Sequence, residues 1–406
     1  MKVCHGSSRR QLRTLCHFVK GRFGSLSGPS SSGGGGAALL LLLLLPLLLC
    51  TFPRLPGDLA FAGAPQPRAK QLLTGQAAIG AVDTATTVLA EVELPAALAE
   101  IEEAAARSAA RRYRSVELEL PAEFATGPVS AAFIGPSEEL GRRAEVAGQS
   151  PLVLLHGFDS SSLEFRRLLP ELESAGVAVH LFDILGWGFG ETSAVRDFSP
   201  AAKRAHLHAF WKQHLGGRPM VLGGASLGGG IAIDFAAAYP EAVERLVLID
   251  AQAFIDGAPQ LGPLGGLGIK VLSSWPLRWM ANQMAYFDKE RFATDDAVRI
   301  GKLHLEAKGW EEASLNYLNS GGYTLSPLVS RISAPTLLLW GEQDGILDGS
   351  EQVPRFQSEL RGSVDLHWIP ECGHCPHLEQ PARAAELIAA FLVEDSACRR
   401  SDSQSR

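Results

Sequence analysis

A series of short apolar runs from residue 113 onward constrains the fold of this chain more than any other feature. Each run has the length of a single strand, and most are separated by segments of helical character. Runs that are apolar throughout are typical of strands buried on both faces, as in a mainly parallel sheet covered by helices. The sequence therefore predicts an α/β fold. The predicted strands are 113–120, 129–134, 152–155, 177–182, 220–222, 246–249, 336–339 and 366–369.

One interval is too long for a simple crossover between neighbouring strands. No apolar run of this kind occurs from Ala251 to Ser333, but bulky apolar residues concentrate there. We interpret the interval as a helical cap inserted after the sixth predicted strand. A cap over the sheet would close an apolar pocket from above, and Trp275, Trp279 and Phe287 are the residues expected to line it.

The first 62 residues have a composition unlike the rest. They carry seven Lys or Arg and one acid, and up to Ser32 they contain no Asp or Glu. A fourteen-residue apolar run, Ala37 to Cys50, follows a glycine linker and precedes the small residues Ala60 to Ala62. Since a membrane-spanning helix needs about 20 apolar residues, this pattern favours a removable signal.

The order of these parts resembles the bipartite presequences of plastid proteins sent to the thylakoid lumen. We therefore expect a plastid location, in the thylakoid lumen or at the thylakoid surface, with secretion, mitochondria and a retained membrane anchor as alternatives. The expected organisation is a targeting presequence (1–62), a helical extension (63–112), a core in two parts (113–250 and 334–394), the cap (251–333) and a polar tail (395–406). Within the extension, residues 95–112 are rich in Ala, Glu and Arg and predict a continuous helix.

Composition excludes several classes of protein. With 46% hydrophobic and 20% charged residues, the chain is neither disordered nor fibrous. A net charge of −7 gives no sign of nucleic-acid binding, and six cysteines in 406 residues are too few for a disulfide-stapled scaffold.

The strongest chemical motif is Gly224-Ala225-Ser226-Leu227-Gly228. It follows an apolar strand directly and precedes a predicted helix, which is the context of a nucleophile elbow. Ser226 is therefore the candidate nucleophile. The alternatives are a plain glycine-rich turn and a phosphate-binding loop, but the Lys-Ser/Thr ending of a P-loop is absent here.

A serine nucleophile needs a base, and the base needs a carboxylate to orient it. Two predicted strands end just before suitable residues, Asp344 and His374. Asp250 and Asp348 are alternative acids. His367 and His377 are less favoured as bases, because one lies within a strand and the other beside a proline.

Together the segments LLHGF, GASLGG, WGEQD and CGHCPHLEQP resemble the α/β-hydrolase superfamily, in its lid-bearing serine branch, over about residues 114–392. The resemblance implies an α/β-hydrolase fold with Ser226 as nucleophile, Asp344 as acid and His374 as base. A serine at 226 argues against the dehalogenase and epoxide-hydrolase branches, which use an aspartate there.

An oxyanion hole is expected from two backbone N–H groups, those of Leu227 and Phe158. Asp159, the next residue in that turn, is either an ordinary turn residue or a polar group that faces the substrate. Cys372 and Cys375 bracket His374, and we interpret them as structural cysteines, with a disulfide between them that tunes activity as the alternative in an oxidising lumen. A redox or zinc site is disfavoured, since neither a thioredoxin context nor a second ligand pair is visible.

The expected activity is hydrolysis of a carboxylic ester with an apolar acyl or prenyl group, through an acyl-enzyme and without a metal or organic cofactor. Carbon-carbon bond hydrolysis, acyl transfer and slow-turnover ligand reception by the same fold are the alternatives. The expected partner is a small apolar ester, reached through peripheral membrane contact, and the sequence does not predict an oligomeric state.

Overall fold

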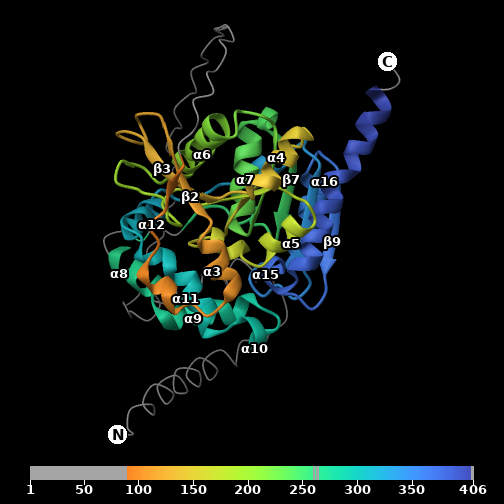
Figure 1. The fold of residues 1–406 in the computed structure, drawn as a ribbon. Coiled ribbons are helices and arrows are strands. Elements are labelled where there is room, and N and C mark those ends of the chain that lie inside the picture. Colours follow the sequence, from red (N-terminus) through yellow and green to blue (C-terminus); the bar gives the residue numbers. More distant parts are fainter. Residues whose placement is uncertain (1–88, 259–260, 262–264, 404–406) are drawn as a thin grey trace, which may run out of the picture.

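The computed structural model describes residues 89–403, apart from 259–260 and 262–264, as a nine-stranded sheet between layers of helices (Figure 1). The strands lie in the order β1-β2-β3-β5-β4-β6-β7-β8-β9. From β5 to β9 all neighbours are parallel, whereas β1, β2, β3 and β5 pair antiparallel. The strands are β1 (Ala90–Glu91), β2 (Tyr113–Leu118), β3 (Val129–Ile134), β4 (Leu152–Leu155), β5 (Val179–Phe182), β6 (Met220–Ala225), β7 (Val243–Ile249), β8 (Thr336–Gly341) and β9 (Val364–Ile369).

The predicted fold class is confirmed, and each of the eight predicted strands is present. The main differences are at strand ends: β2 stops at Leu118, while β6 and β7 extend beyond the apolar runs that predicted them. The short strand β1 was not predicted. It contains only two exposed residues, so it has no apolar pattern, and it exists through its pairing with β2.

Alternating strand residues form the two cores. Leu152 and Leu154 of β4 belong to the core on one face of the sheet, and Val153 and Leu155 belong to the core on the other. This explains why the run is apolar at every position. Helices α3 (Ala104–Ala110), α5 (Leu168–Ser174) and α16 (Pro381–Ser403) cover the first face, and α6 (Pro200–Ala209), α7 (Leu227–Ala238) and α14 (Gly349–Glu359) cover the second.

Helices between β7 and β8 form the cap, which lies beside α3 in Figure 1. Because β1 precedes the predicted strands, the cap follows the seventh strand of the sheet, which is the sixth of the predicted series. Its helices are α8 (Gly265–Leu272), α9 (Trp275–Ala285), α10 (Lys289–Phe292), α11 (Asp295–Lys302), α12 (Trp310–Asn319) and α13 (Ser326–Val329).

The prediction of one continuous helix over 95–112 is wrong. The segment forms a 3-10 helix, η1 (Ala96–Glu100), and the short helix α3, separated by extended backbone at Ile101 and Glu103. Ile101 is buried, and the amides of Glu102 and Glu103 donate to the carboxylate of Asp296 in the cap at 3.0 and 2.8 Å. These tertiary contacts outweigh the helix propensity of the segment.

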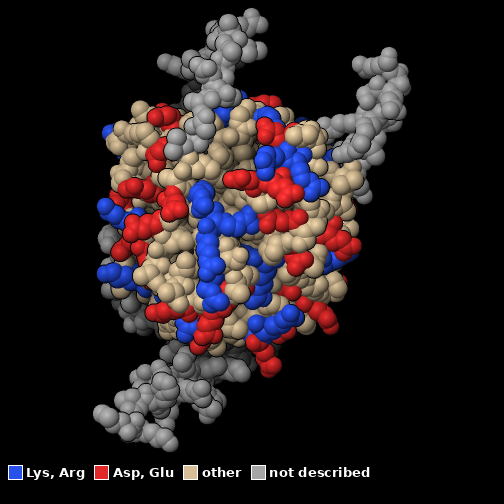
Figure 2. Space-filling view, in the orientation of Figure 1, with Lys and Arg blue, Asp and Glu red and all other residues tan. Residues whose placement is uncertain are grey.

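The predicted presequence, with its apolar run at 37–50, lies outside the described residues, as does most of the extension from 63. Among the residues that the structure does describe, none of the helices combines the length and apolar character needed to span a bilayer. On the face shown in Figure 2, acidic and basic side chains are intermixed.

Candidate active site

Ser226 lies in a strained turn between β6 and α7. Its backbone has φ 52° and ψ −120°, in the left-handed half of the map that side chains rarely occupy. The two flanking glycines make this turn possible: a Cβ on Gly224 would lie 2.6 Å from the Leu155 carbonyl oxygen, and one on Gly228 would overlap that same atom. The local sequence therefore dictates the geometry of a nucleophile elbow.

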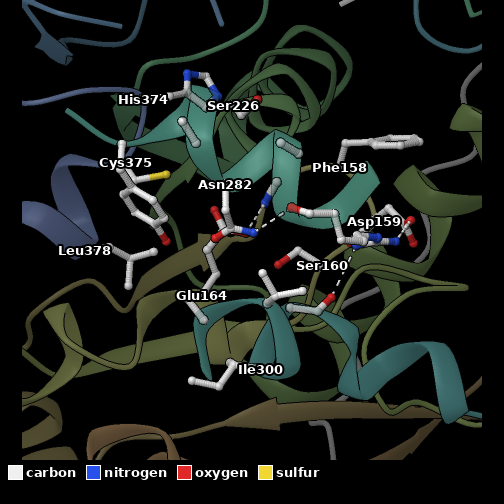
Figure 3. Close-up of a pocket in the computed structure, with 18 of the residues that line it drawn as sticks. Phe158, Asp159, Ser160, Glu164, Ser226, Asn282, Ile300, His374, Cys375 and Leu378 are labelled. Atoms are coloured by element: carbon white, nitrogen blue, oxygen red, sulfur yellow. Dashed lines mark hydrogen bonds and ion pairs between the residues drawn. The ribbon is translucent and has the colours of Figure 1, made fainter. Parts of the chain in front are cut away.

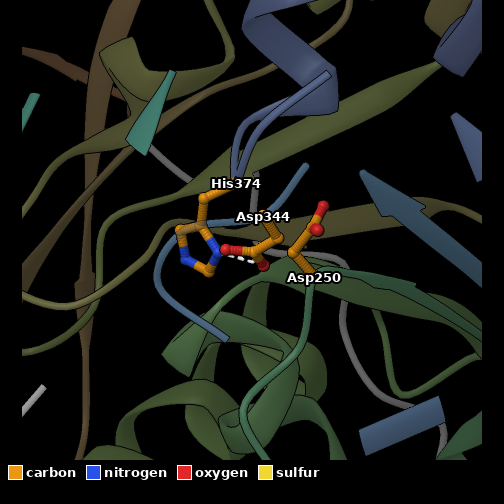
Figure 4. A group of neighbouring side chains, drawn as sticks. All are labelled: Asp250, Asp344 and His374. Atoms are coloured by element: carbon orange, nitrogen blue, oxygen red, sulfur yellow. Dashed lines mark hydrogen bonds and ion pairs between the residues drawn. The ribbon is translucent and has the colours of Figure 1, made fainter. Parts of the chain in front are cut away.

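His374 and Asp344 lie on the loops that follow β9 and β8. The Nδ1 of His374 is 2.7 Å from Oδ2 of Asp344 (Figure 4), and the other carboxylate oxygen of Asp344 accepts the amides of Ile346 and Leu347. Burial opposes ionisation of Asp344, but the imidazole outweighs it and lowers the pKa of this carboxyl. By the same contact the pKa of His374 is raised, although burial opposes its protonation.

The alternative acids differ from Asp344 in their surroundings. Asp348 caps α14 through the amide of Ser350 and is far too exposed to orient a buried imidazole. Asp250 is fully buried at the end of β7; its Oδ1 accepts the amide of Gly341 at 2.9 Å, and its Oδ2 has no partner. Burial and the nearby Asp344 carboxylate raise the pKa of Asp250 well above its usual value.

Asp250, Asp344 and His374 together form a cluster whose ligand atoms lie within 4.8 Å of one another. Such a cluster could be taken for a metal site. However, Nδ1 of His374 and Oδ2 of Asp344 bind each other, and Oδ1 of Asp250 accepts the amide of Gly341. The group is arranged to orient an imidazole.

Ser226 and His374 line one cavity of about 300 Å³ between the sheet and the cap (Figure 3). Its lining is mostly apolar. The cap contributes the inner face of α9 and part of α11, and the core contributes the turn after β4 and the His374 loop. The lining includes Leu163, Leu272, Leu277, Ala281, Ala285, Tyr286, Ala297, Val298, Ile300, Ile346 and Leu378.

The turn after β4 presents a backbone donor to this cavity. In the described part of the chain, neither the amide of Phe158 nor that of Leu227 donates to another protein group. Glu164 holds the turn by accepting the amide of Gly157 at 2.9 Å. Burial opposes the ionisation of Glu164, but contact with His377 outweighs it and lowers the pKa to about 2. This supporting carboxylate lacks a sequence motif and was missed.

Asp159 lines the cavity, but its carboxylate does not face a substrate. It accepts Trp310 Nε1 at 2.7 Å and His304 Nε2 at 2.9 Å, and it pairs with Arg278. All three partners belong to the cap. Asp159 is thus a lining residue, as predicted, but its carboxylate ties the cap to the turn.

The prediction that Trp275, Trp279 and Phe287 line the pocket is wrong. Their exposed fractions are 38%, 40% and 46%, and they lie outside the lining of the cavity. The face of α9 that looks inward instead carries Leu277 and Ala281, two and six residues after Trp275. Large apolar side chains predicted a pocket, but Trp275 and Trp279 lie on the exposed side of α9, and Phe287 lies exposed beyond its end.

Cys372 and Cys375 are free thiols with different surroundings. Cys372 is buried beside Glu379, whereas Cys375 lines the cavity. Burial raises the pKa of both thiols, so neither is a thiolate at neutral pH.

Comparisons with known proteins agree with this fold. A model of the "Alpha/beta hydrolase family" matches residues 152–387. "Alpha/beta hydrolase domain-containing protein VTE7" of Arabidopsis thaliana is 37% identical over 73% of this chain and 89% of its own. "Lipase 1" of Psychrobacter immobilis is 26% identical (61% and 77% covered), and a 2-hydroxy-6-oxononadienedioate/2-hydroxy-6-oxononatrienedioate hydrolase of Burkholderia vietnamiensis is 29% identical (60% and 88%). The chain therefore belongs to the α/β-hydrolase family of enzymes.

Proposed function

We propose that this hydrolase cleaves a carboxylic ester through an acyl-enzyme. Ser226 attacks the acyl carbonyl while His374 takes its proton, and His374 then gives that proton to the leaving alcohol. Asp344 holds the imidazole in the required tautomer. Water, deprotonated by His374, then releases the acid. The observation that carries the proposal is one cavity lined by a serine in a strained elbow and by a histidine bound to a buried aspartate.

The developing oxyanion would be stabilised by the amides of Phe158 and Leu227. Both amides have no other acceptor among the described residues, so they are available to a substrate oxygen. Removal of one such donor typically costs about 3 kcal/mol of transition-state stabilisation.

An apolar acyl or prenyl ester is the substrate class that the cavity supports best. Apart from His374, its basic residues are Arg166 and Arg278, and each is already paired with a carboxylate, Glu103 or Asp159. No cation among these lining residues is left for an acidic substrate. The likeness to a lipase agrees with an ester, and peripheral membrane contact would give access to it.

The same residues could also serve a carbon-carbon bond hydrolase, an acyltransferase or a ligand receptor with slow turnover, and these remain the alternatives. The relative named for a dioate acts on a substrate with two carboxylates, and the paired arginines of this cavity make such a substrate unfavourable here. For location we propose a plastid, which is supported by the basic, acid-free leader and the apolar run behind it.

The test is labelling with a fluorophosphonate probe, with Ser226→Ala as the matched control, followed by turnover of p-nitrophenyl esters of increasing chain length. Labelling that depends on Ser226, with sustained turnover that improves with chain length, is the expected result. A folded wild-type protein that takes no label would refute the activated serine. Labelling with negligible turnover would favour acyl transfer, carbon-carbon cleavage or reception.

A further inference from the structure

Four exposed large apolar side chains lie in cap helices α8 and α9 or directly after α9. Leu267 is 59% exposed, and Trp275, Trp279 and Phe287 are the three residues that do not line the cavity. We call these four residues the cap patch. They make up half of the large apolar side chains that the described residues leave exposed. A soluble protein exposes such a group for a reason more often than by chance.

Helix α9 separates the cap patch from the cavity. Trp275 and Trp279 point to its exposed side, while Leu277, Ala281 and Ala285 line the cavity on the other. One helix thickness therefore lies between the patch and the proposed substrate site. An apolar phase in contact with the patch would be adjacent to the pocket.

The residue types and charges of the region suit a bilayer surface. Tryptophan and phenylalanine are favoured at the membrane-water interface, where an amphipathic helix can lie with its apolar face in the headgroup region. Residues 265–302 contain six basic and four acidic residues, whereas the whole chain contains 37 and 44. The segment that carries the patch therefore lacks the acidic excess of the whole chain, although one of its bases, Arg278, is buried against Asp159.

We propose that the cap patch docks on a lipid bilayer, so that the enzyme takes an apolar ester from the membrane through its cap. This inference rests on the proposed function and specifies how its substrate is reached. A second copy of the chain and the residues before 89 are the competing occupants of the patch, and the test separates them.

The tryptophans allow the docking to be measured in the full chain. Residues 1–88 contain no tryptophan, so an apolar leader that inserts by itself is silent in tryptophan fluorescence. Trp187, Trp211, Trp310 and Trp340 are buried within the fold, which leaves Trp275, Trp279 and Trp368 exposed. The probe is a phosphatidylcholine vesicle with brominated acyl chains, with and without phosphatidylglycerol, because bromine quenches only tryptophans that enter the bilayer.

We expect brominated vesicles to quench the wild-type protein, and the double variant Trp275→Phe, Trp279→Phe to lose that quenching. Trp368→Phe is the matched control, since it removes an equally exposed tryptophan outside the cap. Vesicle binding without quenching would mean that the leader alone binds, and it would overturn the proposal. The proposal is equally overturned if quenching survives in the double variant, or if the patch is occupied by a second copy, seen as a dimer that Trp279→Asp dissociates.

A second readout connects docking to catalysis. In Trp275→Asp, Trp279→Asp we expect vesicle binding to weaken by about tenfold or more, with a matching loss in hydrolysis of a vesicle-embedded ester. Turnover of a soluble short-chain ester should be unchanged. Val146→Asp, a 90% exposed position on α4 (Glu138–Val146), is the control. A protein that hydrolyses neither ester would refute the proposed function, while the quenching experiment would still decide the docking.

Discussion

Removal of the charge on Asp159 is the perturbation that best tests how the cap is bound to the rest of the fold. The carboxylate of Asp159 is 6% exposed and binds Arg278, His304 and Trp310, all from the cap. Burial opposes the ionisation of Asp159, but Arg278 and His304 outweigh it and hold the pKa of this carboxyl far below its usual range. Burial lowers the pKa of His304, so the imidazole is neutral at pH 7 and donates from Nε2.

Asp159→Asn keeps the size of the side chain but removes its charge. Arg278, whose side chain is 15% exposed, would then be an uncompensated buried cation. Breaking a buried ion pair in this way costs about 3–5 kcal/mol. Because the asparagine can still accept from one ring donor, we expect the free energy of unfolding to fall by about 3 kcal/mol. For roughly 300 ordered residues this loss lowers the melting temperature by roughly 5 °C.

The assay is urea denaturation of wild type, Asp159→Asn, Arg278→Met and the double variant at neutral pH. If the pair interacts as described, the summed losses in unfolding free energy of the two single variants exceed the loss of the double variant by at least about 1 kcal/mol. The carboxylate stabilises the fold above the unfolded pKa of about 3.9, and this contribution is lost as the pH falls below it. The gap between wild type and Asp159→Asn should therefore close in acid. Simple additivity, or a gap that does not depend on pH, would refute this reasoning.

Three further predictions concern the proposed catalytic residues and the elbow. Asp344→Asn should lower kcat by about 10⁴, whereas Asp250→Asn should retain most activity because Asp344, and not Asp250, binds Nδ1 of His374; equal losses on a soluble ester would contradict this assignment. In the wild type, kcat/KM should fall about tenfold per pH unit below the raised pKa of His374, since the base must be neutral, and a flat acid limb would exclude His374. Gly228→Ala should cost about 1–3 kcal/mol by overlap with the β4 carbonyl, while Gly301→Ala, where a Cβ meets nothing within 4 Å, should leave the thermal midpoint unchanged or higher.

The sequence predicted those parts of the structure that depend on local pattern. Strands buried on both faces are apolar at every position, and the loops at their carboxyl ends meet at one edge of the sheet. For this reason the neighbourhood of Asp344 and His374 could be predicted from the strand ends alone. The break after η1 could not, because it depends on a contact with Asp296, some two hundred residues away.

Which face of a cap helix points to the cavity could not be predicted either. Helix α9 carries apolar residues on its inner and its outer side, so its sequence has no clear polar face. A prediction based on the number of large apolar residues therefore buries Trp275 and Trp279. In the structure, smaller side chains of α9 face the cavity instead. The same two-sided pattern that misled the prediction is what supports a membrane-facing surface.

The cap is also bound to the loop that carries His374, and this limits how the cavity can open. The amide of His374 donates to the carbonyl of Ala285 at 2.7 Å, at the end of α9. Glu379, in α15 (Pro376–Glu379), accepts the amide of Gly373 next to His374 and also the amides of Phe287 and Asp288 in the cap.

The turn after β4 has the same double attachment, since it carries the proposed donor Phe158 directly before Asp159, which binds the cap. A cap that lifted as a rigid lid would break both attachments and disturb the proposed base, His374, and the proposed oxyanion donor, Phe158, together. Entry of substrate must therefore leave these two attachments intact. Helix α9 carries both attachments, through Arg278 and Ala285, whereas α8, with Leu267 of the cap patch and the cavity residue Leu272, carries neither. We therefore expect the movement that admits substrate at α8.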